Sequence, residues 1–329
     1  MGGARFWLRW SWRDLRRRWL QVLATALVIA IGTGLYAGLG GMREWRERSN
    51  DISFAQLSYH DLRIDVSEGT YVRAGRMERA LRELRRTGAV AVAEERLIVP
   101  TQVDASRAGR TVLVPGQIVG VPLGGGRPRV DELWAGAGRA LRPEDANRDV
   151  AVLDLAFARH YGLPATGTLR VPRLGRLPYA GYGLSPQYFL VSGPGFFGGE
   201  ATFAVLYAPM RAAQRAAGRP GAVNQLLVRL GGGVGTARAE REVRAALRRA
   251  LPGVGTSFTR GTDERAYRVL YDDAESDQRI LNVFAYLVLG GAAFAAFNLI
   301  SRVVESERRE IGVGMALGVA PRLLACGRS

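Results

Sequence analysis

The sequence predicts an α+β membrane protein in which two transmembrane helices flank an extracytoplasmic domain of two lobes. Three observations predict this fold class. Two long uncharged apolar runs lie near the two ends of the 329-residue chain, a β-α-β pattern occurs twice between them, and about 120 residues of short strands and turns separate the two patterns. We expect the two β-α-β units to form one lobe and the mainly-β stretch between them to form an inserted second lobe.

Each apolar run is long enough to cross a bilayer as a helix. The second run covers residues 280–300, and its 21 residues would extend about 31 Å as a helix, which matches a bilayer core. The first run covers residues 19–42, and its 24 residues allow some tilt. A cleaved signal peptide is the competing interpretation of the first run, but the apolar core of a signal peptide is only roughly 7–15 residues long. We therefore expect two transmembrane helices.

The charges beside these runs predict the orientation of the chain. Residues 1–18 contain six arginines against one aspartate, together with three tryptophans, which is typical of a cytoplasmic amphipathic segment on the inner leaflet. Residues 272–278, just before the second run, are mainly acidic, and three arginines follow that run. Because basic flanks stay in the cytoplasm, both termini are expected there, with residues 43–279 outside.

Small residues on both spans predict close packing against other membrane helices. Gly34 and Gly38 have the GxxxG spacing that lets helices approach, and Gly291 and Ala295 provide a similar small face on the second span. The alternative is that glycine and alanine are simply common in membrane helices and in GC-rich genomes.

The outer domain is expected to consist of one lobe that is split in sequence and a second lobe inserted into it. The predicted strand-helix-strand units are residues 61–66, 72–86 and 89–95 in the first unit, and 225–230, 236–251 and 254–258 in the second. Two such units commonly pair into one four-stranded, ferredoxin-like sheet with helices on one face. The expected boundaries are about 57–97 and 223–262 for the split lobe, about 98–222 for the inserted lobe, and about 263–279 for a stalk helix.

The composition argues against a nucleic-acid partner and against a cysteine-based site. All 46 basic residues are arginines, and they exceed the 30 acidic residues to give a net charge of +16. They are spread along the chain without a nucleic-acid-binding motif, so anionic membrane lipid is the simpler partner. Cys326 is the single cysteine, so no intrachain disulfide or cysteine zinc site can form. His60 and His160 are expected to be structural or surface residues.

No catalytic arrangement is apparent in the sequence. The glycine clusters at 124–126 and 231–235 are not followed by the Lys-Ser/Thr of a phosphate-binding loop, so the chain is not expected to hydrolyse ATP. The acidic residues between Asp263 and Asp277 are expected to form the solvated face of the stalk. We therefore expect no enzyme activity, no cofactor and no metal site.

Four segments together resemble FtsX/MacB-type ABC transporter permeases, and their order and spacing cover nearly the whole chain. They are RDLRRRWLQVLATALVIAIGTG (13–34), AVLDLAFARHYGLPATGTLRV (151–171), FAVLYAPMRAAQRAAGRPGAVNQLLVRL (203–230) and ESERREIGVGMALGVAPRLL (305–324). The last is similar to the family's ERxREIGxxxAxGA segment after the second span. The resemblance implies a bacterial inner-membrane protein with a porter-like lobe outside.

The resemblance also implies the partners and a coupling surface. Family members pair with a separate or fused ATP-binding subunit and work as a dimer, so a second copy or a second permease chain is expected. By position, residues 301–329 would be a cytoplasmic coupling segment that begins an FtsX-like domain. The residues expected to contact the ATPase are Glu305, Glu307, Arg308, Arg309, Glu310 and Ile311. Because family members have further spans after this segment, we expect a truncated, frame-shifted or split permease.

The expected function is that of a membrane permease subunit in an ABC transport system. It would relay ATPase-driven motion to the outer domain for export or for handling a lipoprotein, peptide or antibiotic. The alternative is a two-span membrane sensor or regulator that acts on an external partner, such as a cell-wall hydrolase, without transport.

Overall fold

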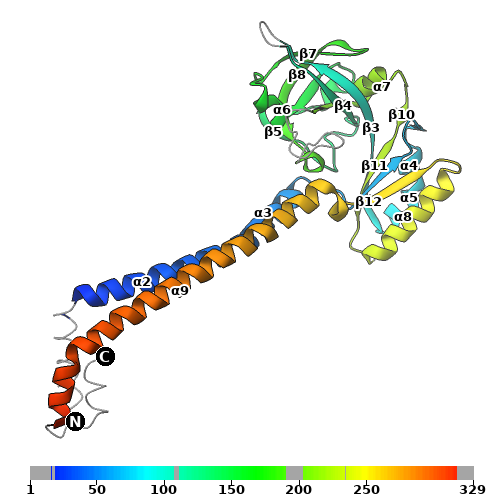
Figure 1. Cartoon of the computed structure of the whole chain (residues 1–329). Coiled ribbons are helices and arrows are strands. Elements are labelled where there is room, and N and C mark those ends of the chain that lie inside the picture. Colours follow the sequence, from blue (N-terminus) through cyan, green and yellow to red (C-terminus); the bar gives the residue numbers. More distant parts are fainter. Residues whose placement is uncertain (1–15, 17–18, 107–110, 190–202, 234, 317–329) are drawn as a thin grey trace. The chain divides into compact units, whose positions relative to one another are not determined.

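The computed structural model describes residues 16, 19–106, 111–189, 203–233 and 235–316, and this part of the chain divides into two compact units (Figure 1). A helical unit contains the chain up to Arg48 and from Asp272 onward, and a sheet-rich unit contains Ser49–Tyr271. Two candidate membrane helices thus flank a mixed α and β domain, and the predicted fold class is confirmed.

The described part of the helical unit contains three helices, α2 (Trp19–Gly40), α3 (Met42–Gln56) and α9 (Arg265–Ala316), of which α3 and α9 extend into the sheet-rich unit. Ala26–Gln56 and Arg265–Arg302 are long and apolar enough to cross a membrane. Large apolar side chains on both are exposed, such as Leu27 at 57% and Phe294 at 68%. Apolar surface of this extent on a helix suits contact with lipid rather than water.

The first lobe of the sheet-rich unit is an antiparallel four-stranded sheet, with the order β12-β1-β11-β3. Its strands are β1 (Leu62–Val66), β3 (Val90–Asp104), β11 (Gln225–Leu230) and β12 (Thr256–Arg260). In chain order this is 4-1-3-2, the ferredoxin-like order that the two β-α-β units predict. The central strand β1 has the burial alternation of a sheet with one covered face.

Helices cover one face of this sheet, and apolar side chains fill the space between. They are α4 (Arg76–Ala80), α5 (Arg82–Arg86) and α8 (Thr236–Ala250). Met77 and Leu81 from the first β-α-β unit share one buried cluster with Ile64 of β1. Val243 and Leu247 from the second β-α-β unit belong to the same cluster. Shared burial of this kind is what joins two units that are distant in sequence into one lobe.

The predicted helix over residues 72–86 is wrong at its start and is interrupted. Residues Val72–Arg73 form the short strand β2, paired with β10 (Ala222–Val223), and α4 begins only after Gly75, which has a left-handed φ of 79°. The buried Glu95 carboxylate accepts hydrogen bonds from the backbone N–H groups of Gly75, Met77 and Glu78. A carboxylate from the neighbouring strand therefore caps α4 from outside the helix.

The second lobe is a ring of six strands, β3-β4-β9-β6-β8-β7, in which β7 pairs with both β8 and β3. The further strands are β4 (Leu113–Val121), β5 (Trp134–Gly138), β6 (Ala151–Asp154), β7 (Gly167–Val171), β8 (Gly175–Leu184) and β9 (Ala204–Pro209). Short helices accompany them: α6 (Leu155–His160), α7 (Met210–Ala217) and the 3-10 turns Pro143–Asp145 and Pro186–Tyr188. A further 3-10 turn, Gly261–Asp263, lies between β12 and α9. A closed ring leaves few free strand edges.

The strand β3 joins the two lobes. Its first part, up to Arg96, pairs with β11 of the first lobe, and its second part, from Leu97, pairs with β4 of the second lobe. The strands β4, β6 and β9 are buried on both faces, because alternate side chains enter two different apolar clusters. The second of these clusters, which includes Val119 and Tyr207, borders the cavity described below.

Candidate functional site

Within the helical unit, α2 and α9 lie side by side (Figure 1). Their close contact is at Gly32, where an added Cβ would lie 2.6 Å from the Cβ of Ala292. Further along the pair, the ring centroids of Tyr36 and Tyr286 are 5.8 Å apart. Glycine at position 32 is therefore what lets α2 come this close to α9.

The face of α9 toward this contact is a seam of small side chains. Ala274, Ala285 and Ala296 are buried, and Gln278 and Ala292 fall on the same face. The intervals of four and seven residues are those of helices that pack along a shared seam. The seam thus brings two backbones close together and leaves the large apolar side chains of α9 on the outside.

The predicted packing residues lie elsewhere on the two helices. An added Cβ on Gly34, Gly38 or Gly291 would meet nothing within 4 Å, and Ala295 is partly buried. The contact between α2 and α9 therefore uses Gly32, which sequence reasoning missed although it lies in the same glycine-rich run. The role of Gly34, Gly38, Gly291 and Ala295 in packing against other membrane helices stays a prediction.

A break between α2 and α3 is closed by a side chain from α9. In a regular helix, the Arg43 backbone N–H would donate to the Leu39 carbonyl, but the helix is interrupted at Gly41. Instead, the Arg43 N–H donates to Gln278 Oε1 at 2.9 Å, and Gln278 Nε2 donates to the Leu39 carbonyl at 3.0 Å. Gln278 Nε2 also donates to Asn282 Oδ1 at 2.7 Å. One buried amide therefore satisfies both backbone groups that the break leaves open.

Charged side chains extend the contact one turn beyond this amide. Arg46 of α3 forms ion pairs with Asp277 and Asp273 of α9. These side chains are between one third and two thirds exposed, so the pairs contribute to the position of the helices more than to stability. Arg279 and Glu275 form a further pair along α9 itself.

A buried histidine joins three parts of the sheet-rich unit. His60, just before β1, places Nδ1 2.8 Å from Asp131 Oδ2, and its backbone N–H donates to Asp131 Oδ1 at 3.0 Å. Its Nε2 lies 3.4 Å from Glu264 Oε1, immediately before α9, and Arg63 Nε lies 3.1 Å from the same oxygen. The expectation that Glu264 belongs to a solvated face is therefore wrong, because the fold turns it inward to meet two cations.

The charge of His60 follows from these neighbours. Burial by itself would lower the pKa of the imidazole, but the charges and hydrogen bonds of Asp131 and Glu264 outweigh it and raise the pKa to about 9. His60 is thus a positive charge at neutral pH, held between two carboxylates. This arrangement agrees with the structural role expected for His60, and no group of metal-ligating side chains is found among the described residues.

Aromatic rings connect the last turns of α3 with the first turns of α9 inside the sheet-rich unit. Phe54 lies 5.1 Å from Tyr267, and Tyr267 stacks on Tyr271 at 4.3 Å between ring centroids. The Tyr271 hydroxyl also bonds to the Asp51 carboxylate. Both helices are therefore joined by side chains at the point where they enter the domain.

The predicted coupling residues lie on the last turns of α9. The helix continues to Ala316, so residues 305–311 are helical, and Glu305 and Arg308 are exposed. The side chains of Glu307, Arg309, Glu310 and Ile311 lie outside the part that the structure describes, as does nearly all of the predicted amphipathic segment 1–18. The contact of this segment with an ATPase stays a prediction.

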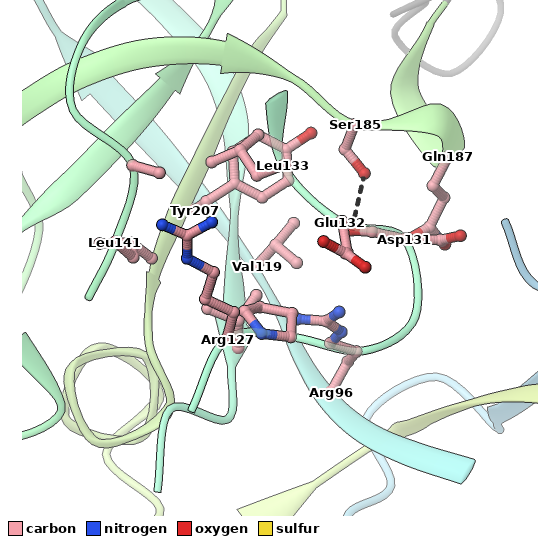
Figure 2. A pocket seen from close by; sticks show the side chains of 13 residues that line it. Arg96, Val119, Arg127, Asp131, Glu132, Leu133, Leu141, Ser185, Gln187 and Tyr207 are labelled. Atoms are coloured by element: carbon pink, nitrogen blue, oxygen red, sulfur yellow. Dashed lines mark hydrogen bonds between the residues drawn. The ribbon is translucent and has the colours of Figure 1, made fainter. Parts of the chain in front are cut away.

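A cavity lies in the sheet-rich unit at the junction of its two lobes (Figure 2). Its volume is about 60 Å³. Arg96 of β3, Tyr207 of β9 and Gln187 line it together with the loop that carries Arg127 and Glu132. Sequence reasoning did not predict this cavity, because its lining comes from segments that are distant along the chain.

Comparison with protein families decides the class of the chain. The model of the family described as "MacB-like periplasmic core domain" matches residues 22–246. The chain belongs to this family. No curated protein matches the chain.

Solved structures of MacB-like domains are similar to the chain at low sequence identity. The periplasmic region of MacB from Actinobacillus actinomycetemcomitans is 12% identical, with 63% of this chain and 92% of that chain covered and a TM-score of 0.43. The extracellular domain of the noncanonic ABC-type transporter YknZ from Gram-positive bacteria is 9% identical, with 59% and 99% covered and a TM-score of 0.40.

Membership of the MacB-like family confirms the predicted resemblance and assigns a general role. The chain is a membrane protein with an extracytoplasmic domain, and its role is that of an ABC-type permease component. ABC-type permeases work in general with an ATP-binding partner.

Proposed function

We propose that this MacB-like chain is the membrane permease subunit of an ABC transport system, and that it relays motion from a separate ATP-binding subunit to its outer domain. The observation that carries the proposal is α9, a single helix of 52 residues without a proline. At 1.5 Å per residue it extends about 78 Å. It includes the acidic turns, the seam against α2 and the coupling segment, so in this proposal one continuous helix would pass on a displacement of the coupling segment.

Unlike α9, the first membrane helix is interrupted, and this difference supports a relay of motion. The chain from α2 to α3 is interrupted at Gly41, and only Gln278 of α9 closes the interruption among the described residues. Helices bend where their hydrogen-bond ladder is broken. One continuous helix beside one helix that can bend is an arrangement that would convert a displacement into a change of angle.

The partners and the orientation follow from the same proposal. Both termini would be cytoplasmic, in a bacterial inner membrane, and residues 305–311 would dock on the ATP-binding subunit through charges and one apolar side chain, Ile311. A second copy of the chain or a second permease chain would pack against Gly34, Gly38 and Gly291. The cargo would be a lipoprotein, peptide or antibiotic taken from the outer face.

A charge exchange in the coupling segment tests the proposal. The full chain would be co-expressed with a candidate ATP-binding subunit, and the complex recovered in detergent by a tag on the permease. We expect the double variant Arg309→Glu, Glu310→Arg to lower ATPase recovery at least fivefold, because it reverses the charge pattern without changing the net charge.

The matched control is the double variant Glu275→Arg, Arg279→Glu. It exchanges one arginine and one glutamate elsewhere on the same helix, which form an (i, i+4) ion pair, and should leave recovery unchanged. Equal recovery from the two double variants would mean that residues 305–311 are not the coupling surface. If the intact complex hydrolyses ATP and activates a cell-wall hydrolase but moves no cargo in proteoliposomes, the regulator alternative replaces transport.

A further inference from the structure

We propose that the cavity between the two lobes binds a small zwitterion of amino-acid type, with one carboxylate and one ammonium group. This site goes beyond the proposed transport function, because it requires neither the ATP-binding subunit nor the membrane helices. The proposal rests on the unsatisfied polar groups of the cavity wall, which are hydrogen-bond donors and a carboxylate acceptor.

The first kind is a set of hydrogen-bond donors. Arg96 is 2% exposed, and its Nη2 is occupied by Glu94 Oε1 at 2.5 Å and by the Val130 carbonyl at 2.6 Å. Its Nη1 is buried without a hydrogen-bond partner among the described residues, and so is Gln187 Nε2. Tyr207 Oη faces the same cavity, where the Ser185 side chain is its polar neighbour. Buried donors without partners are costly. Their convergence on one cavity fits a ligand that supplies acceptor oxygens.

The positive charge of the arginines in this donor set favours a ligand with a carboxylate over a ligand with a neutral carbonyl. Arg127 lines the same cavity and is exposed, so its guanidinium is free to close over a ligand. Figure 2 shows the side chains of Arg96, Arg127 and Tyr207 around the same space. Two arginines with a tyrosine hydroxyl are a typical donor set for a carboxylate.

The second kind is a carboxylate that can accept a cation. Of the two acidic residues in the wall, Asp131 has both oxygens bonded to His60. Glu132 Oε1 accepts a hydrogen bond from the Ser58 hydroxyl at 3.1 Å, and no bond to Oε2 is found among the described residues. An ammonium group beside Glu132 would satisfy this oxygen and offset the repulsion between Glu132 and a bound carboxylate.

The size and the walls restrict the rest of the ligand. A cavity of about 60 Å³ has room for four to six water-sized groups at about 10–15 Å³ each. Glycine and alanine have a similar number of heavy atoms. Val119, Leu133 and Leu141 provide an apolar wall for a short aliphatic side chain.

Calorimetric titration of the full chain in detergent tests the site without any ATPase. The probes are alanine, N-acetylalanine, which keeps only the carboxylate, and alaninamide, which keeps only the ammonium. We expect alanine to bind and each single-charge analogue to bind at least tenfold more weakly. If no probe binds at 50 mM, or if either analogue binds as well as alanine, the assignment to a zwitterion is overturned.

Variants then locate the binding. We expect Arg127→Gln, Tyr207→Phe and Glu132→Gln each to weaken alanine binding at least fivefold. The matched control is Arg129→Gln, since Arg129 is an exposed arginine of the same loop that does not line the cavity. Each variant is first shown to unfold at the wild-type temperature, so that a loss of binding is not a loss of fold. Equal binding by all four variants would place the alanine elsewhere and overturn the site.

Discussion

Gln278 accepts a hydrogen bond from the backbone N–H of Arg43 across 235 residues of sequence. The same amide donates to the Leu39 carbonyl, so a side chain takes the place of one backbone hydrogen bond in the first membrane helix. Two helices that enter the membrane at opposite ends of the sequence are thereby joined at one polar point within an apolar contact.

Replacement of Gln278 by alanine should destabilise the chain. Both backbone groups at the break would lose their partner in a partly buried position, at a cost of about 1–2 kcal/mol. Denaturant unfolding of the full chain in detergent, followed by circular dichroism, measures the effect. Arg279→Ala is the control, since that side chain is 75% exposed, and it should have little effect. An unchanged midpoint for Gln278→Ala would show that the break does not depend on this amide.

A larger side chain at Gly32 should separate the two membrane helices. Gly32→Val places atoms where Ala292 already lies, and overpacking of this kind costs about 1–3 kcal/mol. Gly34→Val is the matched control in the isolated chain, because nothing lies within 4 Å of that position. The two variants are compared by thermal unfolding in detergent. Equal loss of stability in both would contradict the contact at Gly32.

The same pair of variants also tests the predicted packing role of Gly34. If Gly34 and Gly38 pack against another membrane helix, Gly34→Val should leave the isolated chain stable and weaken its association with a second copy or a second permease chain. Cross-linking in membranes, with Gly32→Val as the comparison, measures this association. A Gly34→Val chain that associates like the wild type would remove Gly34 from that interface.

Stability of the outer domain should depend on pH through His60. Because its pKa is raised to about 9 from 6.5, the folded state binds the proton more tightly than the unfolded chain. The stabilisation is therefore complete below pH 6.5 and is lost as the pH rises through 9, and it amounts to on the order of 3 kcal/mol. Thermal unfolding between pH 6 and pH 10 should show this decrease, and His60→Gln should reduce the pH dependence. A wild-type profile that does not fall across this range would contradict a charged His60.

The ion pair between Arg46 and Asp277 should contribute little and should be sensitive to salt. Both side chains are partly exposed, and exposed pairs typically contribute about 0.2–1 kcal/mol. A double-mutant cycle with Arg46→Ala and Asp277→Ala, at low and at high salt, measures the coupling energy. A coupling well above this range, or one that salt does not change, would mean that the pair is shielded from solvent.

The spacing of apolar residues alone predicted the helices and strands whose side chains pack into a single core. The helix at 236–250 is found almost as expected, because its apolar spacing matches one buried face. The strand at 225–230 is found as expected from its short apolar run, which is buried on both faces. The order of the four strands followed from the repeated β-α-β pattern. The break after Gly75 did not, since it depends on Glu95 from another strand, and a long-range contact leaves no local spacing to detect.

The sequence also predicted some features of the candidate sites and not others. The two apolar spans were visible because a membrane helix requires a continuous apolar run. The choice of Gly32 over Gly34 was not, since both are small residues of one run and only the position of α9 distinguishes them. The cavity was also invisible, because Arg96, Glu132 and Tyr207 come from three separate segments.

By itself, the sequence determined the class of the protein: two membrane spans, a split outer domain and an ABC permease family, all of which are expressed in local composition and order. Tertiary structure alone decided which glycine meets α9, which acidic residue is turned inward to His60, and which amide closes the break at Gly41. The physical reason is that composition and periodicity report the average environment of a segment, whereas a hydrogen bond or a close contact depends on the position of a second segment that the local pattern does not contain.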